Sequence, residues 1–209
     1  LKGAGIINLS RDRVPPLADI NARLHPLTKW QSRAVPGYLP AKAFFACLAR
    51  REFPTTVVIR PKESLDYLPE PDIFHDIFGH VPLHADPVFA DFLQTYGKAA
   101  LLTDDPYHTE RLARLFWFTV EFGLIREGGR NRLYGSGLIS SPGESKHALT
   151  SDKVDRRPFD LDTVCNTSFE IDHYQQILYV LESFEQLRDA MNSYATRLID
   201  SAGKTAVHA

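Results

Sequence analysis

The segment Glu-Pro-Asp-Ile-Phe-His-Asp-Ile-Phe-Gly-His-Val-Pro, residues 70–82, constrains this chain more than any other, because it sets two histidines five residues apart among helix and turn signals. Residues five apart on an ideal α-helix point about 140° away from each other. His75 and His80 can therefore reach one metal ion only if the helix unwinds near His80. Gly79 and Pro82 permit that, since both residue types favour the end of a helix. Two unrelated histidines at a helix end are the structural alternative.

Glu121 is the third candidate ligand. It is the only charged residue between Arg114 and Arg126, within the apolar segment 115–125. A buried ionised carboxylate is costly unless a cation or hydrogen-bond donors compensate it, or unless it is protonated. A metal ion would compensate it, and so would a salt bridge to a core arginine. Two histidines and one carboxylate form the facial triad of non-haem Fe(II) oxygenases, which leaves coordination positions open for O₂ and substrate.

A catalytic zinc site uses the same ligand types, so a zinc-dependent hydrolase is an alternative. The His-Glu-x-x-His pattern of zinc proteases is absent, because His75 and His80 are spaced as His-x-x-x-x-His. A hydrolase would also need a general base close to the metal, and Asp76 is the only nearby candidate in the sequence. A binding module without catalysis is a further alternative, although such a module would be expected to have lost a ligand.

Five segments carry motifs that occur together, and in this order, in one known family: Val35–Pro40, Glu70–Leu83, Asp86–Asp91, Phe116–Ile125 and Tyr134–Ser141. The chain resembles the pterin-dependent aromatic amino acid hydroxylases, and among them the compact bacterial phenylalanine hydroxylases. The resemblance covers residues 13–190, and the combination of segments is far more specific than any one of them.

The resemblance implies a mainly helical α+β fold, a catalytic domain of the aromatic-amino-acid-hydroxylase type with short strands and a metal-binding cleft. It implies Fe(II) bound by His75, His80 and Glu121, with a tetrahydrobiopterin-like reduced tetrahydropterin as the second cofactor. The implied reaction is the hydroxylation of L-phenylalanine to L-tyrosine with O₂. Tryptophan or tyrosine as the substrate, or another ring position, stays open because the shape of the pocket decides between them.

Four residues would contact the pterin if the family pattern holds. Phe44 would stack on the pterin ring, Gly37 and Leu39 would offer backbone contacts, and Ala113 would lie near the cofactor. An aromatic residue on the apolar face of a helix is usually part of the core. The role of Phe44 therefore rests on the resemblance.

Another four residues would contact the amino acid. Arg60 would bind its carboxylate, which an arginine can do through two parallel hydrogen bonds, with Asp72 as a candidate orienting partner. Trp117 would form a wall of the pocket for the aromatic ring, and Gly137 and Ser140 would line that pocket. A surface arginine and a tryptophan used only for packing are the structural alternatives.

Ser140 would also hold His75 through the ring nitrogen that does not bind the metal, which is the usual support for a ligating histidine. Three other positions depart from the family pattern. Leu68 stands where some animal members of the family have a threonine, so contacts to the head of the amino acid can differ in detail. Phe116 replaces a tyrosine and removes a hydroxyl near the iron and the pterin, and Ser136 replaces an alanine.

Composition favours small molecules as partners. The 209 residues, 44% hydrophobic and 24% charged, suit one compact domain over residues 1–209. A formal net charge of -2 without a basic block argues against nucleic acid or an acidic membrane as a partner, and no apolar run has transmembrane length. Cys47 and Cys165 lie far apart in the sequence, which fits a reducing compartment, so we expect a cytoplasmic enzyme.

The two ends are expected to be less regular, with an irregular lead-in at 1–14 and a frayed tail at 202–209. Because the sequence starts at Leu1, we expect the natural N-terminus to lie upstream. The sequence contains neither a regulatory domain before the matched region nor a tetramerising helix with heptads after it. We therefore expect a monomer without allosteric activation by substrate.

Hydrophobic periodicity and breaker residues predict the secondary structure. A short helix is expected to begin at Pro71, with Glu70 or Asp72 near its cap, and residues 142–166 are expected to be rich in loops. The other predicted elements are helices at 17–24, from Pro40, at 87–97 and through Glu121, strands at 55–60 and 177–181, and a helix opened by the capping box Ser183-Phe-Glu-Gln186.

Overall fold

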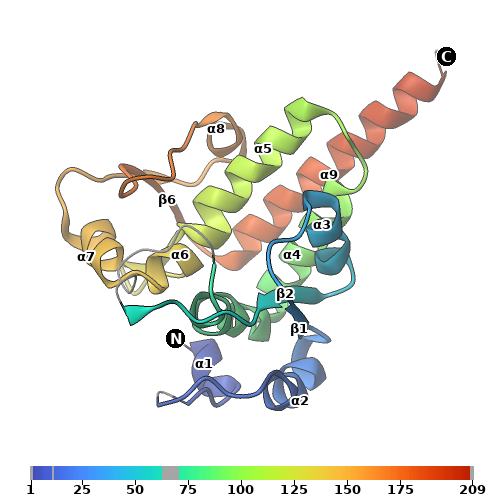
Figure 1. The fold of residues 1–209 in the computed structure, drawn as a ribbon. Coiled ribbons are helices and arrows are strands. Elements are labelled where there is room, and N and C mark those ends of the chain that lie inside the picture. The colour runs from blue at the N-terminus through green and yellow to red at the C-terminus, as the bar shows by residue number, and fades with distance from the viewer. Residues whose placement is uncertain (1, 11, 63–70, 208–209) are drawn as a thin grey trace.

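Figure 1 shows the fold of the chain in a computed structural model. The structure describes residues 2–10, 12–62 and 71–207. The departure expected at Leu68 and the expected cap residue Glu70 lie outside the described residues. The described part is mainly helical with two small sheets, as the sequence predicted.

Helices form most of the described chain, and some of them depart from α geometry. No helix in the described ranges combines the length and the apolar character that a membrane crossing needs. The α-helices are α1 (Lys2–Ile6), α2 (Leu17–Thr28), α3 (Ala41–Ala49), α4 (Pro87–Ala100), α5 (Pro106–Phe116), α6 (Ser136–Ile139), α7 (Pro142–Thr150), α8 (Leu161–Asn166) and α9 (Phe184–Val207). The π-helical segments are η2 (His75–His80) and η4 (Trp117–Glu121), and η3 (Val81–Ala85) is a 3₁₀ segment.

The strands form a two-stranded and a four-stranded sheet. β1 (Gln31–Val35) and β2 (Glu52–Thr56) pair in parallel. The larger sheet has the order β4-β3-β6-β5, in which β3 is antiparallel to β4 and β6 is parallel to both of its neighbours. Its strands are β3 (Leu124–Glu127), β4 (Arg130–Leu133), β5 (Asp155–Pro158) and β6 (Ile177–Leu181).

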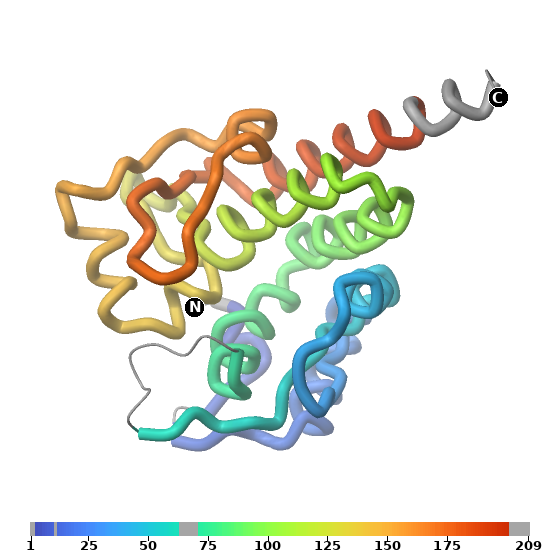
Figure 2. The backbone as a smooth tube through the Cα atoms, turned by 45° about the horizontal axis from the view of Figure 1, so that its top comes forward, coloured from blue at the N-terminus to red at the C-terminus, as the bar shows by residue number. Residues whose placement is uncertain are grey.

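Helix α4 lies at the centre of the core. Its large apolar side chains recur at positions i, i+3, i+4 and i+7, which is the spacing of one helical face. Helices α3 and α9 both pack against α4, as the views in Figures 1 and 2 show. The four side chains on the buried face of α4 are each at most 1% exposed, as the sequence predicted: Phe89, Phe92, Leu93 and Tyr96.

The strand predicted at 55–60 lies further toward the N-terminus, at Glu52–Thr56. Strand β1 offers backbone partners only as far as Thr56, which pairs with Val35. Beyond that point Val57, Val58 and Ile59 are each more than half exposed. β-branched residues favour a strand only where neighbours pack against them, so this apolar run continues without strand pairing.

The segment predicted to be rich in loops, 142–166, instead contains α7, β5 and α8. Helix α7 begins after Ser141, whose side chain accepts the backbone N–H of Glu144. Helix α8 begins in the same way after Asp160, whose carboxylate accepts the N–H of Thr163. Such caps stabilise short helices that show little hydrophobic periodicity of their own.

Both ends of the chain are more helical than predicted. The lead-in expected to be irregular contains α1, whose Gly3 lies so close to η3 that an added Cβ would be 1.8 Å from the carbonyl oxygen of Pro82. Helix α9 continues through Val207, into the segment predicted to fray. Tertiary contact accounts for α1, and the absence of proline from the end of α9 allows its backbone ladder to continue.

Candidate metal centre and its surroundings

His75 and His80 stand at the two ends of η2. In a π-helix each N–H bonds to the carbonyl five residues earlier, so the turn is wider than an α-helical turn. Residues five apart therefore lie close to one another, and the Nε2 atoms of the two imidazoles are 2.9 Å apart. The predicted unwinding at His80 is wrong in detail, because the helix widens and then tightens into η3 instead of ending at Gly79. The prediction that both rings reach one point is confirmed.

Glu121 comes to the same point from η4, which is also π-helical. The N–H of Phe122 bonds to the carbonyl of Trp117 at 2.9 Å, the five-residue pattern again. The carboxylate oxygens of Glu121 lie 3.5 Å from Nε2 of His75 and 3.2 Å from Nε2 of His80. One ligand atom from each of the three side chains lies within 4.8 Å of the others.

The electrostatics of this cluster suit a divalent cation. Burial lowers the pKa of His75 to about 4, so its imidazole is neutral near pH 7 and has a lone pair to offer. Burial alone would raise the pKa of Glu121, but the charge that the two imidazoles carry when protonated, together with a backbone N–H from Gly137, outweighs burial and lowers it. The carboxylate of Glu121 and one nitrogen of each imidazole thus face one another. They form the ligand set of two-histidine, one-carboxylate metal centres.

The other ring nitrogen of His75 is held by Ser140, the C-terminal cap of α6. Its Nδ1 lies 2.8 Å from Oγ of Ser140. The hydroxyl of Ser140 donates to the carbonyl of Ser136 at 2.8 Å, so Oγ accepts the N–H of the imidazole. This contact was predicted, and it leaves Nε2 of His75 as the unprotonated nitrogen that points toward Glu121.

Arg60 lies beyond the end of β2 and is held by Asp72. Its Nε and Nη2 donate to the two oxygens of Asp72 at 2.9 and 2.8 Å, which confirms the predicted partner. Asp72 is fully buried and also accepts the backbone N–H of His75 at 2.9 Å. Burial would raise the pKa of Asp72, but these hydrogen bonds lower it. The carboxylate therefore joins the guanidinium to the first residue of η2.

Trp117, which was predicted to line the substrate pocket, lies at the start of η4. The side chains that contact it were not indicated by the sequence. Its ring is stacked on Phe169 with centroids 4.4 Å apart and packs against Phe122 at 4.5 Å. Its Nε1 donates to the side chain of Gln175 at 2.9 Å. Phe169 and Gln175 belong to the irregular segment between α8 and β6, where no periodicity could have indicated them. Gly137, another residue predicted to line this pocket, is in α6.

The residues predicted to contact a pterin lie in separate elements. Phe44 is on α3 and packs edge-on against Phe116 at the end of α5, with centroids 5.7 Å apart. Ala113, one turn before Phe116, is exposed, and Gly37 and Leu39 lie between β1 and α3. The structure thus joins α3 to the end of α5 through Phe44, next to η4.

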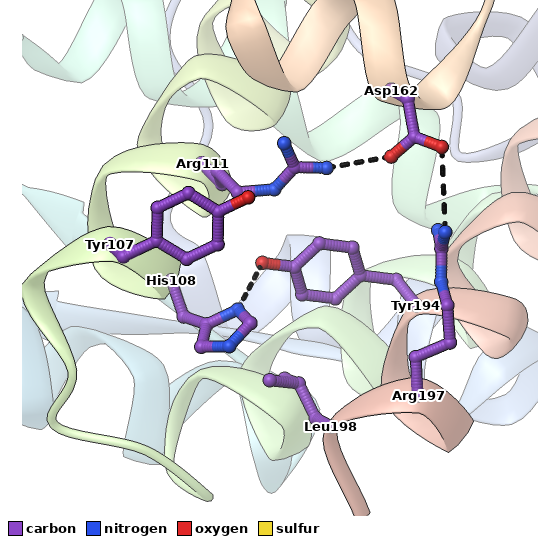
Figure 3. Close-up of a pocket in the computed structure, with 7 residues that line it drawn as sticks. All are labelled: Tyr107, His108, Arg111, Asp162, Tyr194, Arg197 and Leu198. Carbon is purple, nitrogen blue, oxygen red and sulfur yellow. Dashed lines mark hydrogen bonds and ion pairs between the residues drawn. The ribbon is translucent and has the colours of Figure 1, made fainter. Parts of the chain in front are cut away.

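A separate cavity of about 250 Å³ lies between α5, α8 and α9. Figure 3 shows that Asp162 pairs with both Arg111 and Arg197 across it, and that His108 bonds to the hydroxyl of Tyr194. These groups satisfy one another, and none of them belongs to the metal cluster. The cavity is lined by Tyr107, His108, Arg111, Asp162, Tyr194, Arg197 and Leu198.

Known proteins are similar to this chain in sequence and in fold. The family described as biopterin-dependent aromatic amino acid hydroxylase matches residues 5–202. A phenylalanine-4-hydroxylase of Ralstonia nicotianae is 45% identical over 203 residues, which cover 97% of this chain and 65% of that protein. A tyrosine 3-monooxygenase of Rattus norvegicus is 42% identical over 187 residues, 90% of this chain and 37% of that protein.

A crystal structure of Chromobacterium violaceum phenylalanine hydroxylase, described as having bound iron(III) and the oxidised cofactor 7,8-dihydrobiopterin, matches with a TM-score of 0.89 at 44% identity. The match covers 95% of this chain and 73% of that one. The chain belongs to the biopterin-dependent aromatic amino acid hydroxylase family. It spans between 64% and 66% of the length of five bacterial phenylalanine-4-hydroxylases that it matches.

Proposed function

We propose that this chain forms the catalytic part of a phenylalanine 4-monooxygenase, which converts L-phenylalanine to L-tyrosine with O₂, Fe(II) and a tetrahydropterin. The observation that carries the proposal is the convergence of His75, His80 and Glu121, with nitrogen and oxygen atoms 2.9 to 3.5 Å apart. The phenylalanine-4-hydroxylases among its relatives support the choice of substrate. Hydroxylation of tyrosine or tryptophan, or at another ring position, is the alternative within the family.

His75, His80 and Glu121 would hold the Fe(II), which together with the reduced pterin supplies the activation of O₂. The side chains of the protein would position the substrate. Arg60, oriented by Asp72, would bind the carboxylate of the amino acid. Correct placement of a reacting ring against an oxidant contributes strongly to rate, because it replaces an unfavourable encounter by a bound geometry.

The aromatic side chains would define the two ligand pockets. Trp117, fixed by Gln175 and stacked on Phe169, would form a rigid wall for the substrate ring. Gly137 and Ser140 would complete that pocket. The pterin would stack on Phe44, with Gly37, Leu39 and Ala113 around it.

Zinc-dependent hydrolysis is less well supported. Its general base would be Asp76, whose side chain is 4% exposed. One of its oxygens already accepts the backbone N–H of Thr56 at 2.7 Å. A carboxylate in that position holds β2 to η2 and is poorly placed to accept a proton from an attacking water. The monomeric state and the cytoplasmic location stay predictions from the sequence.

The fate of oxygen tests the proposal. The anaerobically iron-loaded chain, given tetrahydropterin, ¹⁸O₂ and L-phenylalanine, should place one labelled atom in L-tyrosine and the other on the pterin. Mass spectrometry of both products measures this, and parallel reactions with tyrosine and tryptophan decide the substrate. Label arriving from water, or full turnover without pterin, would contradict the proposal.

The phenylalanine at position 116 allows a second test, which compares the amount of pterin oxidised with the amount of tyrosine formed. Phe116 stands where the family pattern has a tyrosine, beside Phe44 of the proposed pterin pocket. We expect somewhat more pterin to be oxidised than tyrosine to be formed, and Phe116→Tyr to bring the ratio closer to one.

A further inference from the structure

Ser136 lies fully buried at the first residue of α6, directly beside the second histidine. Its Oγ is 2.9 Å from Nδ1 of His80, whose side chain is only 3% exposed. The family pattern predicts alanine at this position, so the hydroxyl is a feature of this chain.

The direction of this hydrogen bond follows from the metal site. A neutral imidazole that offers the lone pair of Nε2 to a metal carries its proton on Nδ1. His80 would then donate its N–H to Oγ of Ser136, as His75 does to Oγ of Ser140. The ring of Phe53, with its centroid 4.5 Å from that of His80, packs on the imidazole but does not select a tautomer.

The two serines are spaced so that each can meet one of the two histidines on η2. Ser136 and Ser140 are four residues apart, so they share one face of α6 and its C-terminal cap, while the two histidines are five apart on a π-helical turn. Gly79 allows the two segments to approach, since an added Cβ there would be 3.0 Å from Cβ of Ser136. Each serine hydroxyl therefore meets one imidazole.

We propose that Ser136 is a positioning residue for His80. It accepts the N–H of Nδ1, keeps Nε2 unprotonated, and fixes the ring so that Nε2 points at the ion. The inference rests on the metal site of the proposed function. It adds a second hydroxyl support, so that both histidines of the site are held from one short helix and its C-terminal cap.

The test compares metal affinity in three serine variants. Ser136→Ala should weaken Fe(II) binding about tenfold or more, the range typical of a lost support behind a ligating histidine. Ser140→Ala should do the same through His75. Ser32→Ala is the matched control, because Ser32 is 3% exposed and its Oγ has no hydrogen-bond partner among the described residues. Affinity is measured anaerobically by competition with a chelator, and circular dichroism checks the fold.

A spectroscopic readout separates positioning from general destabilisation. In the Co(II)-loaded chain, the N–H protons of the two ligating imidazoles should give two separate, strongly shifted NMR signals. Ser136→Ala should move or broaden one of them and Ser140→Ala the other. Fe(II) affinity within twofold of the wild type together with two unchanged signals in Ser136→Ala would overturn the proposal. Tight metal binding without hydroxylation in the wild type would instead count against the proposed function alone.

Discussion

Buried polar side chains order this site, and Arg60, the proposed partner of the substrate carboxylate, is an example. Asp72 holds its guanidinium through two hydrogen bonds and is itself tied to the N–H of His75. The side chain of Arg60 is therefore fixed relative to the metal cluster before any substrate binds. Pre-ordering of this kind reduces the entropy that is lost when the substrate is held.

Replacement of Arg60 should weaken substrate binding strongly. A charge-assisted hydrogen bond contributes about 1.5 to 3 kcal/mol, so Arg60→Ala should raise the KM for phenylalanine by roughly one to two orders of magnitude. Arg60→Lys should restore only part of the substrate binding, because an ammonium group lacks the planar pair of N–H donors of a guanidinium. Arg126→Ala is the control, since Arg126 pairs with Glu182 on the surface. A KM that is unchanged in Arg60→Ala would place this residue outside the substrate site.

Asp76 gives the metal-free protein a pH-dependent stability. Burial raises its pKa from 3.8 to about 6. Between those pH values the folded state keeps a proton that the unfolded state has lost, so this group lowers the free energy of unfolding as the pH rises. The loss over this interval is on the order of 3 kcal/mol. His75 acts in the opposite direction, because burial lowers its pKa to about 4.

Asp76→Asn isolates this contribution. The amide keeps an oxygen for the N–H of Thr56 but cannot ionise. The free energy of unfolding of the wild type minus that of the variant should therefore fall between pH 4 and pH 6.5, and the contribution of His75 cancels in the difference. Urea denaturation of both proteins at several pH values, in the presence of a chelator, measures this difference. A difference that stays constant with pH would show that Asp76 does not titrate in this range.

Secondary-structure elements were predicted most accurately where the hydrophobic pattern of the sequence coincides with the face that the element buries. Helix α4 was predicted because its apolar face is also its buried face. Helix α2 and strand β6 were predicted for the same reason. Strand β2 was misplaced because its extent depends on β1, a partner about twenty residues earlier in the chain. Helices α7 and α8 were missed because caps, rather than periodicity, mark where they begin.

The two π-helical segments show what a sequence pattern cannot specify. Residue types and motif order indicated His75, His80 and Glu121 as a group. The geometry that joins them depends on one extra residue in each of two turns, and π-helical turns are rare and carry no propensity signal of their own. The supports on α6 and the contacts of Trp117 likewise arise from packing between distant segments. The three candidate ligands were therefore predictable as a group, but most of their surroundings were not.

For the whole molecule, the proposed metal site joins parts of the chain that are far apart in sequence. The two histidines come from η2 and the carboxylate from η4, while α6 supports the rings of both histidines. An unfolded chain would not hold these ligands together. A metal that binds only the folded state stabilises it in proportion to the logarithm of metal concentration over the dissociation constant.

Loading with Fe(II) should therefore raise the melting temperature of the chain. At a free metal concentration one hundred times the dissociation constant the stabilisation is about 2.7 kcal/mol, which corresponds to a rise of roughly 5–10 °C for a chain of this size. Anaerobic calorimetry with and without metal measures the shift. Glu121→Ala should lose most of it, because two imidazoles alone bind the ion weakly, whereas Glu182→Ala, a surface carboxylate, should keep it. An equal rise in Glu121→Ala and in the wild type would mean that the ion binds elsewhere on the chain.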